Sequence, residues 1–232
     1  MRKVLLVLVI LLAGGVVVAD RLGVKIAQDE IAKQVAAQYN LPRKPGVSIH
    51  GVPFLTQAIG GEYDQIDVSI GDWTQQNITV SDLKIELTGL KAPLSEVISG
   101  NSSNMAARTA TASAIIPYDV IKKRAPKGVK GISPEGKDLK LQGTYAFLGF
   151  NTDVTMVVSV KATPEGIAIT PQSVQTAASS IPVSVLQQRL TFTVPVRNLP
   201  IGSRISKVEV TPNGLRVAAT ADNVKFNDLP KA

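Results

Sequence analysis

The sequence predicts an α+β protein in which a long N-terminal helix packs on a mostly antiparallel β-sheet. Two observations predict this class. Apolar residues recur with a helical period up to residue 39, and they alternate with polar residues after Pro45. The 232 residues are enough for one ordinary domain or two small ones with a real hydrophobic core. The change of period therefore separates a helical start from a mainly β body.

Residues 1–19 have the pattern of a membrane-targeting segment. Two cations precede an apolar or Gly run over residues 4–19, and Asp20 restores polarity. As a helix, that run is about 24 Å long at ~1.5 Å per residue, which is short of the ~30 Å hydrocarbon core of a bilayer. The segment is either an export signal that is cut after Ala19 or a retained signal anchor, and the unbroken helical pattern favours the anchor slightly. Both alternatives place the following residues outside the cytoplasm.

Residues 20–39 predict an amphipathic helix that ends at Asn40, ahead of two prolines. Its apolar stripe consists of Leu22, Ile26, Ile31 and Val35. We expect this stripe to pack on the sheet. A helix that lies on a membrane is the alternative, although acidic residues within it disfavour an anionic surface.

Beyond Pro45, alternating apolar and polar residues predict strands with one dry face. The alternating segments lie at residues 66–70, 78–87, 139–145 and 154–160. The second segment has an offset at Ser81 and Asp82, which predicts a β-bulge. Strands with one dry face form antiparallel sheets that are covered on one side.

One type of turn recurs at residues 132–139, 162–169 and 210–217 and predicts three hairpins. In each, Pro fixes φ, and a Gly three positions after Ser or Thr accepts a positive φ. Two short helices are predicted at residues 93–100 and 117–128, each beginning with Pro.

Composition disfavours most catalytic and metal chemistry. The chain has no Cys and a single His, His50, so a disulfide scaffold, a thiolate zinc site and a Cys nucleophile are excluded, and a Ser-His-Asp triad is improbable. GISPEGKD at 131–138 lacks the Ser or Thr of a phosphate loop, and S-x-x-K at 81–84 lies inside a predicted strand. The net charge of +7 comes without an Arg-rich run or many aromatics, so nucleic acid is not an expected partner. We expect a protein that is not an enzyme and has no metal and no cofactor.

The densest positive charge lies at the second short helix and just after it. This basic cluster consists of Lys122, Lys123, Arg124, Lys127 and Lys130. A solvated helix end explains it, because cations near a helix C-terminus are favoured by the helix dipole. The functional alternative is a patch for anionic lipid headgroups, where each cation near the surface adds ~1 kcal/mol.

The stretch at residues 47–70 sets Phe54, Leu55 and Ile59 among several Gly and Pro residues. A buried loop explains this pattern, and so does a hydrophobic lip that opens to lipid.

The same stretch carries a motif, G-x-P-F-L-T-Q followed by G-x-Y. It lies at Gly51, Pro53 to Gln57, Gly61 and Tyr63. The motif resembles the signature of the actinobacterial LmeA-like phospholipid-binding family. Residues 199–224 are similar to the C-terminal pattern of that family, and PLSEVISGN at 93–101 fits as well. The resemblance covers nearly all of the chain beyond residue 20.

The resemblance implies a cell-envelope protein, anchored or secreted, that binds phospholipid in an elongated apolar cavity between a long helix and a curved antiparallel sheet. This architecture is similar to that of the tubular lipid-binding proteins. It also implies a supporting, non-catalytic role in the elongation of envelope lipoglycan (mannan). We therefore expect a segment at 1–19 and one lipid-binding domain at 20–232. A scaffold that recruits a glycan-assembly enzyme is the alternative.

The expected partners are phospholipid, an anionic membrane surface and envelope glycan-assembly proteins. Acyl chains gain about 0.8 kcal/mol per buried methylene, so a cavity lined by apolar side chains suffices to hold them. The candidate lining residues are Phe54, Leu55, Ile59, Trp73, Phe147, Leu148 and Phe150. The basic cluster is the candidate headgroup and membrane-surface site.

Overall fold

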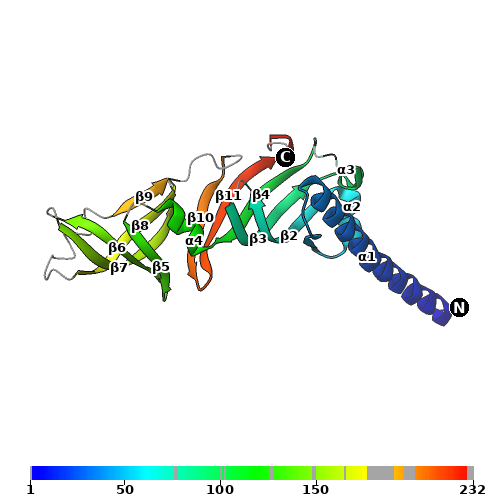
Figure 1. Cartoon of the computed structure of the whole chain (residues 1–232). Helices are drawn as coiled ribbons and strands as arrows, with labels where there is room; N and C mark the ends of the chain where they lie inside the picture. The colour runs from blue at the N-terminus through cyan, green and yellow to red at the C-terminus, as the bar shows by residue number, and fades with distance from the viewer. Residues whose placement is uncertain are drawn as a thin grey trace. The chain divides into compact units, whose positions relative to one another are not determined.

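A computed structural model describes residues 2–75, 78–99, 101, 103–125, 128–147, 150–164, 166–176, 191–195 and 202–228. The chain divides into two compact units (Figure 1). Unit 1 consists of Met1–Ile70, Ile85–Ala110 and Asp222–Ala232, and unit 2 of Gly71–Lys84 and Thr111–Ala221. The expected single domain over residues 20–232 stays a prediction.

The first element is a single long helix, α1 (Arg2–Gln38), which passes through residues 19 and 20 without a break. It ends as predicted, because Asn40 has a φ of 48° in the left-handed region. The N–H of Leu41 donates to the carbonyl of Ala36 at 2.9 Å, which closes the last turn. Among the described residues, no helix is both long and apolar enough to cross a membrane. The transmembrane helix expected at residues 4–19 is therefore not confirmed.

The face of α1 that meets the core differs from the predicted stripe. The residues that pack against the core of unit 1 are Val24, Ala27, Ile31 and Val35. Leu22 and Ile26, which the sequence placed on the core face, are exposed instead. The reason is spacing: intervals of three and four residues keep one face of a helix, whereas the five-residue step from Ile26 to Ile31 turns away from it.

The strands form two sheets. The six-stranded sheet has the order β1 (Gly46–His50), β2 (Glu62–Gln75), β3 (Ile78–Lys91), β4 (Ala106–Ile116), β11 (Gly214–Lys225) and β10 (Arg204–Thr211). The five-stranded sheet follows chain order: β5 (Val129–Glu135), β6 (Asp138–Phe147), β7 (Phe150–Thr163), β8 (Gly166–Thr176) and β9 (Phe192–Pro195). Antiparallel pairing joins β1 to β2, β10 to β11 and each strand of the second sheet to the next. The predicted α+β class, with an N-terminal helix on a mostly antiparallel sheet, is confirmed.

The three predicted hairpins are confirmed by their register. Their closing pairs are Glu135 with Asp138, Thr163 with Gly166, and Thr211 with Gly214. Gly214 is required for space as well as for conformation, because a Cβ there would lie 2.2 Å from the carbonyl oxygen of Ile116. At the predicted bulge in β3, Asp82 has a left-handed φ of 50°.

Four short helices complete the described fold: α2 (Phe54–Gly60), α3 (Leu94–Ser99), α4 (Tyr118–Arg124) and the 3₁₀ turn η2 (Phe226–Asp228). The sequence predicted α3 and α4, although α4 is shorter than expected because it stops at Arg124. In unit 2 the hydroxyl of Tyr118 donates to the carbonyl of Thr211 at 2.6 Å, which ties α4 to the last hairpin.

Each unit has its own hydrophobic core. The buried core of unit 1 consists of Ile49, Phe54, Ala58, Tyr63, Ile66, Val68, Leu90, Ala92 and Ala107. The buried core of unit 2 consists of Leu139, Leu141, Met156, Val158, Val160 and Leu215.

Candidate functional site

The start of α2 is held by a residue from α1. Pro53 stands at the N-cap and offers no side-chain hydrogen bond. Oδ1 of Asp20 accepts a hydrogen bond from the N–H of Leu55 at 2.8 Å and so takes over the role of the cap. Asp20 is only 3% exposed, and its Oδ2 lies 3.7 Å from the Arg21 guanidinium. This carboxylate therefore fixes α2 to α1 from inside unit 1.

Gly23 lets the two helices approach closely. A Cβ at this position would lie 3.4 Å from the ring of Phe54 and 3.6 Å from the side chain of Leu55. The methyl group of Ala would therefore be in ordinary van der Waals contact, whereas a side chain larger than Ala would press on α2, whose first turn lies against α1 between Asp20 and Gly23.

The motif residues of α2 have three different environments. Phe54 is 4% exposed and its ring lies 6.4 Å, centroid to centroid, from that of Tyr63, so it belongs to the core of unit 1. Burial also raises the pKa of Tyr63. Leu55 is half-buried against the same core, whereas Ile59 is 87% exposed. A role in contacting lipid stays a prediction for all three candidates, and Ile59 alone among them faces outward.

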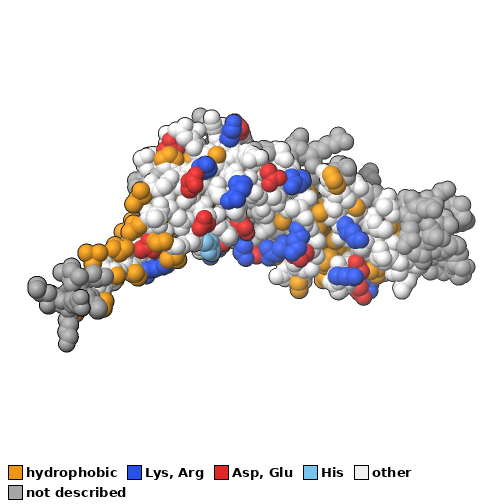
Figure 2. Space-filling view, turned by 180° about the vertical axis from the view of Figure 1, so that it is seen from behind, with side chains coloured by type: hydrophobic (Ala, Val, Ile, Leu, Met, Phe, Trp, Pro, Cys, Tyr) orange, Lys and Arg blue, Asp and Glu red, His pale blue; other side chains and the backbone are white. Residues whose placement is uncertain are grey.

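Exposed apolar side chains continue from the N-terminal part of α1 onto the folded part of unit 1 (Figure 2). Leu22 and Ile26 are 57% and 71% exposed. Val52, in the loop that leads into α2, is 71% exposed. Water-exposed aliphatic side chains of this size are costly in groups, so they indicate a surface that meets something apolar.

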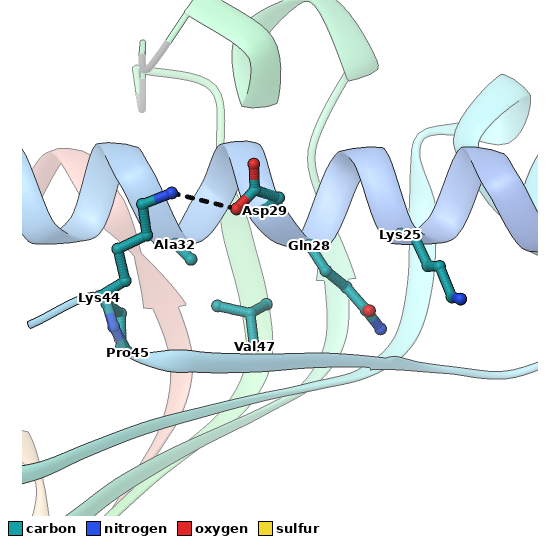
Figure 3. Close-up of a pocket in the computed structure, with 7 residues that line it drawn as sticks. All are labelled: Lys25, Gln28, Asp29, Ala32, Lys44, Pro45 and Val47. Carbon is teal, nitrogen blue, oxygen red and sulfur yellow. Dashed lines mark hydrogen bonds and ion pairs between the residues drawn. The ribbon is translucent and has the colours of Figure 1, made fainter.

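A shallow pocket of about 290 Å³ lies between α1 and β1. Its lining residues are Lys25, Gln28, Asp29, Ala32, Lys44, Pro45 and Val47. Figure 3 shows Lys25 and Gln28 extending from α1 on the β1 side, while Nζ of Lys44 reaches Oδ1 of Asp29 at 3.2 Å. Lys33 and Lys44 both hydrogen-bond to Asp29 and hold the pKa of its carboxyl below its usual range. The pocket therefore combines two lysines, an amide and a carboxylate with three apolar residues.

His50, the single histidine, has structural partners. Its Nε2 lies 2.8 Å from Oδ2 of Asp67, whose Oδ1 accepts a hydrogen bond from Gln65 at 2.9 Å. The side-chain amide of Gln57 donates to the carbonyl of His50 and accepts from the N–H of Asp64. These bonds join β1, α2 and β2 to one another. Within the described part of the chain, no three His, Cys, Asp or Glu side chains gather in a way that could hold a metal ion.

The remaining candidate lipid residues belong to unit 2. Trp73, on β2, is partly exposed. Phe147 and Phe150 are register partners where β6 meets β7, but their side chains and all of Leu148 lie outside the described residues. Phe54, Leu55 and Ile59 thus lie together on one helix of unit 1, and the other four candidates come from a separate unit.

The basic cluster is less uniform than the sequence indicated. Lys122 and Lys123 on α4 are exposed. Nζ of Lys130 lies 3.3 Å from Oδ1 of Asp153, so its charge is already partnered. The side chain of Arg124 and all of Lys127 lie outside the described residues.

Sequence reasoning missed α2 and the role of Asp20. A seven-residue helix with Pro at its N-cap has no local capping signal, because the group that caps it lies 35 residues earlier in the chain. The pocket residues Lys25, Gln28 and Lys44 were also missed, since their meeting depends on the turn from α1 into β1. A cation next to an apolar stripe was the one available signal.

Comparison with known proteins assigns the chain to a family. The family model described as LmeA-like phospholipid-binding matches residues 18–220, which is most of the chain. No curated protein and no solved structure gives a significant match. The protein belongs to the LmeA-like phospholipid-binding family, as its sequence motifs predicted.

Proposed function

We propose that this member of the LmeA-like phospholipid-binding family is a non-catalytic cell-envelope protein that holds the acyl chains of a phospholipid in an apolar cavity. The observation that carries the proposal is the family match over residues 18–220, which includes most of unit 1 and nearly all of unit 2. The family match supports phospholipid binding. The cavity and the absence of catalysis are parts of our proposal.

Physical chemistry supports acyl-chain burial as the source of affinity. Each methylene moved from water to an apolar site gains about 0.8 kcal/mol, so a lipid with two chains can be held without specific polar contacts. A sheet with one apolar face is the architecture that such a site needs, and β6 and β7 have such a face, where Leu139 and Met156 are part of the core of unit 2. Selectivity then depends on groups that meet the headgroup.

We place the protein on the extracytoplasmic side of the cell envelope, where it supports the elongation of lipoglycan (mannan). Two cations at the N-terminus followed by the apolar residues 4–19 support export. The protein is either retained at the membrane through that segment or released after a cut near Ala19. Mass spectrometry of the intact protein from its own cells distinguishes the two forms by the mass of the leader.

The direct test of lipid binding is to identify what the purified protein carries. The full chain is purified in a mild detergent, exchanged into buffer and extracted, and the extract is analysed by lipid mass spectrometry. We expect phospholipid in a fixed ratio to protein, well above that in a mock purification from cells lacking the protein. Lipid at the mock level, together with no uptake of a fluorescent phospholipid, would contradict the proposal.

A lack of catalysis is tested with the same preparation. We expect no hydrolysis of phospholipid or of short esters above the buffer rate, because the family match supports lipid binding and the chain has a single His to act as a general base. Turnover that is lost in His50→Ala would show that the protein is an enzyme.

The alternative is a scaffold that recruits an envelope glycan-assembly enzyme, and the exposed pair Lys122 and Lys123 favours it. Its test is crosslinking in cells with a photoreactive residue at position 123. A reproducible protein partner that is lost in Lys122→Glu/Lys123→Glu, with lipid content unchanged, would support the scaffold.

A further inference from the structure

Exposed large apolar side chains are confined to unit 1 among the residues the structure describes. They are Val7, Ile10, Leu11, Leu12, Val16, Val17, Val18, Leu22, Ile26, Tyr39, Val52 and Ile59. All except Tyr39 come from the first part of α1 or from α2 and the loop before it. Soluble proteins keep contiguous apolar patches small, so this distribution indicates that a partner covers this side of unit 1.

The apolar run of the sequence ends at Asp20, but the exposed apolar surface of α1 extends beyond that residue. Asp20 points inward and its carboxylate is occupied by the N–H of Leu55. It therefore presents no charge at the outer face of α1. That face stays apolar through Leu22 and Ile26, while the exposed Arg21 and Lys25 lie to one side of it. The first charges on the face itself come one turn later, with Asp29, Glu30 and Lys33.

Leu22 and Ile26 lie on the side of α1 that faces away from the core. At 100° per residue they are 40° apart on the helix, and Ala27 and Val24, which face the core, lie near the opposite side. Leu11 is three turns before Leu22 and lies on the same outer face. One apolar row therefore runs along α1 from its N-terminal part to Ile26, where the opposite face of the helix packs on the core of unit 1.

The start of α2 lies at the same level along α1 as this row. The hydrogen bond from Leu55 to Asp20 and the contact of Phe54 with Gly23 place it there. Ile26 is about 4.5 Å further along the helix axis than Gly23. When α1 enters an apolar phase along its axis, a depth that reaches Ile26 also reaches the first turn of α2, and Val52 directly precedes the N-cap of that helix. Ile59, one turn on from Leu55 along α2, adds the most exposed apolar side chain of unit 1.

Cationic and polar groups lie next to the end of the apolar row. Lys25 and Lys44 line the pocket between α1 and β1, together with the amide of Gln28. Lys44 is paired with Asp29 at 3.2 Å, so within the described part of the chain Lys25 is the pocket cation that has no carboxylate partner. An apolar surface whose border carries lysines matches an anionic phospholipid membrane, where acyl chains lie below a layer of phosphates.

We propose that unit 1 docks on an anionic phospholipid membrane through a surface formed by the outer face of α1 up to Ile26, Val52 and Ile59, with Lys25 and the Gln28 amide at the border meeting the phosphate of a headgroup. This deepens the proposed function, on which it rests, by naming where the protein meets the membrane that supplies its lipid. It moves the limit of the membrane-contacting surface from Asp20 into the folded unit.

The chain has no Cys, so a single introduced Cys can carry an environment-sensitive NBD fluorophore. Ile59→Cys places the fluorophore in the proposed surface. Tyr39→Cys is the matched control, because Tyr39 is also an exposed apolar residue of unit 1 but lies beyond the charged turn of α1. Both labelled full-length proteins are mixed with vesicles of phosphatidylglycerol and phosphatidylcholine, and with vesicles of phosphatidylcholine alone.

We expect NBD at position 59 to brighten and shift to the blue on the phosphatidylglycerol vesicles, and to be quenched by lipids with a nitroxide on the acyl chain. NBD at position 39 keeps its spectrum in buffer. If the protein floats with the vesicles while position 59 stays in a water-like environment, the surface ends at Asp20 and the proposal is wrong. A second copy of the chain is the rival occupant: disulfide dimers of unlabelled Ile59→Cys without vesicles, with no spectral change on vesicles, would also overturn it.

Substitutions measure the contribution of the surface. Leu22→Glu and Ile59→Glu are each expected to weaken vesicle binding on the order of tenfold, with unchanged thermal unfolding, because both side chains are exposed. Tyr39→Glu is the control and should bind like the wild type. Lys25→Glu should weaken binding to phosphatidylglycerol vesicles and leave the weaker binding to phosphatidylcholine unchanged. Equal binding by all four variants would contradict the proposal.

The same proteins separate this proposal from the proposed function. If lipid co-purifies but the fluorophore at position 59 stays in a water-like environment, the docking proposal is wrong and lipid binding is supported. Position 59 embedded in the membrane, with no lipid carried by the purified wild type, shows that lipid holding fails while docking stands.

Discussion

The two units use their apolar side chains differently. In unit 2, the described core residues gather between the strands of the second sheet and the last hairpin, and no large apolar side chain among the described residues of that unit is exposed. Unit 1 has a core of similar kind and, in addition, a row of exposed aliphatic residues. A core needs only inward-facing residues, so the outward row of unit 1 serves something other than folding.

The difference follows from the secondary structure that carries the residues. A strand alternates its side chains, so an apolar residue at every second position fills one face and leaves the other polar. The first part of α1 is apolar on all sides, and a helix of that kind is stable only when it is surrounded by apolar material. The comparison shows that α1 contacts a protein core on one side and exposes aliphatic side chains on the other, which is the side that the docking proposal assigns to a membrane.

The largest expected change in stability comes from comparing a buried residue with an exposed residue of the same helix, α2. Phe54→Ala, on the buried side of α2, should lower the free energy of unfolding by about 3–5 kcal/mol, because it leaves a cavity beside Tyr63. Ile59→Ala, on the outer side, should change it by less than about 0.5 kcal/mol. Urea unfolding followed by circular dichroism measures both. Similar losses in the two variants would break the distinction between inward and outward residues.

The next effect concerns the bond that holds α2 to α1. Asp20→Ala leaves the N–H of Leu55 without its partner, which should cost about 1–3 kcal/mol. Asp20→Asn keeps an oxygen acceptor at that place and should recover much of the loss. Hydrogen exchange of the Leu55 amide gives a local measure. Unchanged protection in Asp20→Ala would mean that α2 does not depend on this cap.

A smaller effect is expected in unit 2, from a charge pair that is partly open to water. Arg216 donates to Asp82 at 2.6 Å, and this hydrogen bond, together with Lys84, holds the pKa of the Asp82 carboxyl below its usual range. The unfolded chain thus binds a proton at Asp82 more readily than the folded chain does. The pair stabilises the fold above the ordinary carboxyl range, and this stabilisation is lost as the pH falls through the lowered pKa.

Because both side chains are partly exposed, we expect a contribution of about 0.5 kcal/mol. Unfolding in urea as a function of pH measures it. Asp82→Asn should reduce the decline in stability toward acid pH, and Lys207→Gln, which breaks an exposed pair at another place in unit 2, is the control. An identical pH profile for the wild type and Asp82→Asn would show that the pair contributes nothing measurable to the free energy of unfolding.

The smallest effect lies at the pocket of unit 1. Lys44→Gln removes one of the two lysines that lower the pKa of Asp29, so this pKa should rise toward its ordinary value without reaching it, because Lys33 remains. Carboxyl-selective NMR titration detects the change. The melting temperature should stay the same, since these groups are exposed. A Tm loss comparable with that of Asp20→Ala would indicate that the pocket is part of the core.

Local patterns predicted most of the fold. The helix end at Asn40 and the three hairpins depend on residues within a few positions of each other, and all were confirmed. The predicted core face of α1 was partly wrong, because Leu22 and Ile26 are out of step with Ile31 and Val35 around the helix. The contacts of Asp20 and Gly23 with α2 could not be predicted, since α2 lies more than 30 residues further along the chain.

The candidate site was harder to predict because it is assembled from distant segments. Phe54, Leu55 and Ile59 were singled out together, yet one is buried, one half-buried and one exposed. Their different exposures depend on where each residue lies around the axis of α2. The pocket has contributions from α1 and from the segment around Lys44, and no local pattern links the two.

Asp20 also bears on the maturation of the protein. In the uncut chain it lies in the middle of α1, where a carboxylate gains nothing from that helix. If a peptidase removed residues 1–19, Asp20 would become the first residue of the shortened α1 and would still cap α2. A carboxylate is favoured at the N-terminus of a helix, so it would then stabilise two helices at once, although the new amino group beside it would offset part of this gain. The folded unit is thus compatible with both the processed and the unprocessed form of the chain.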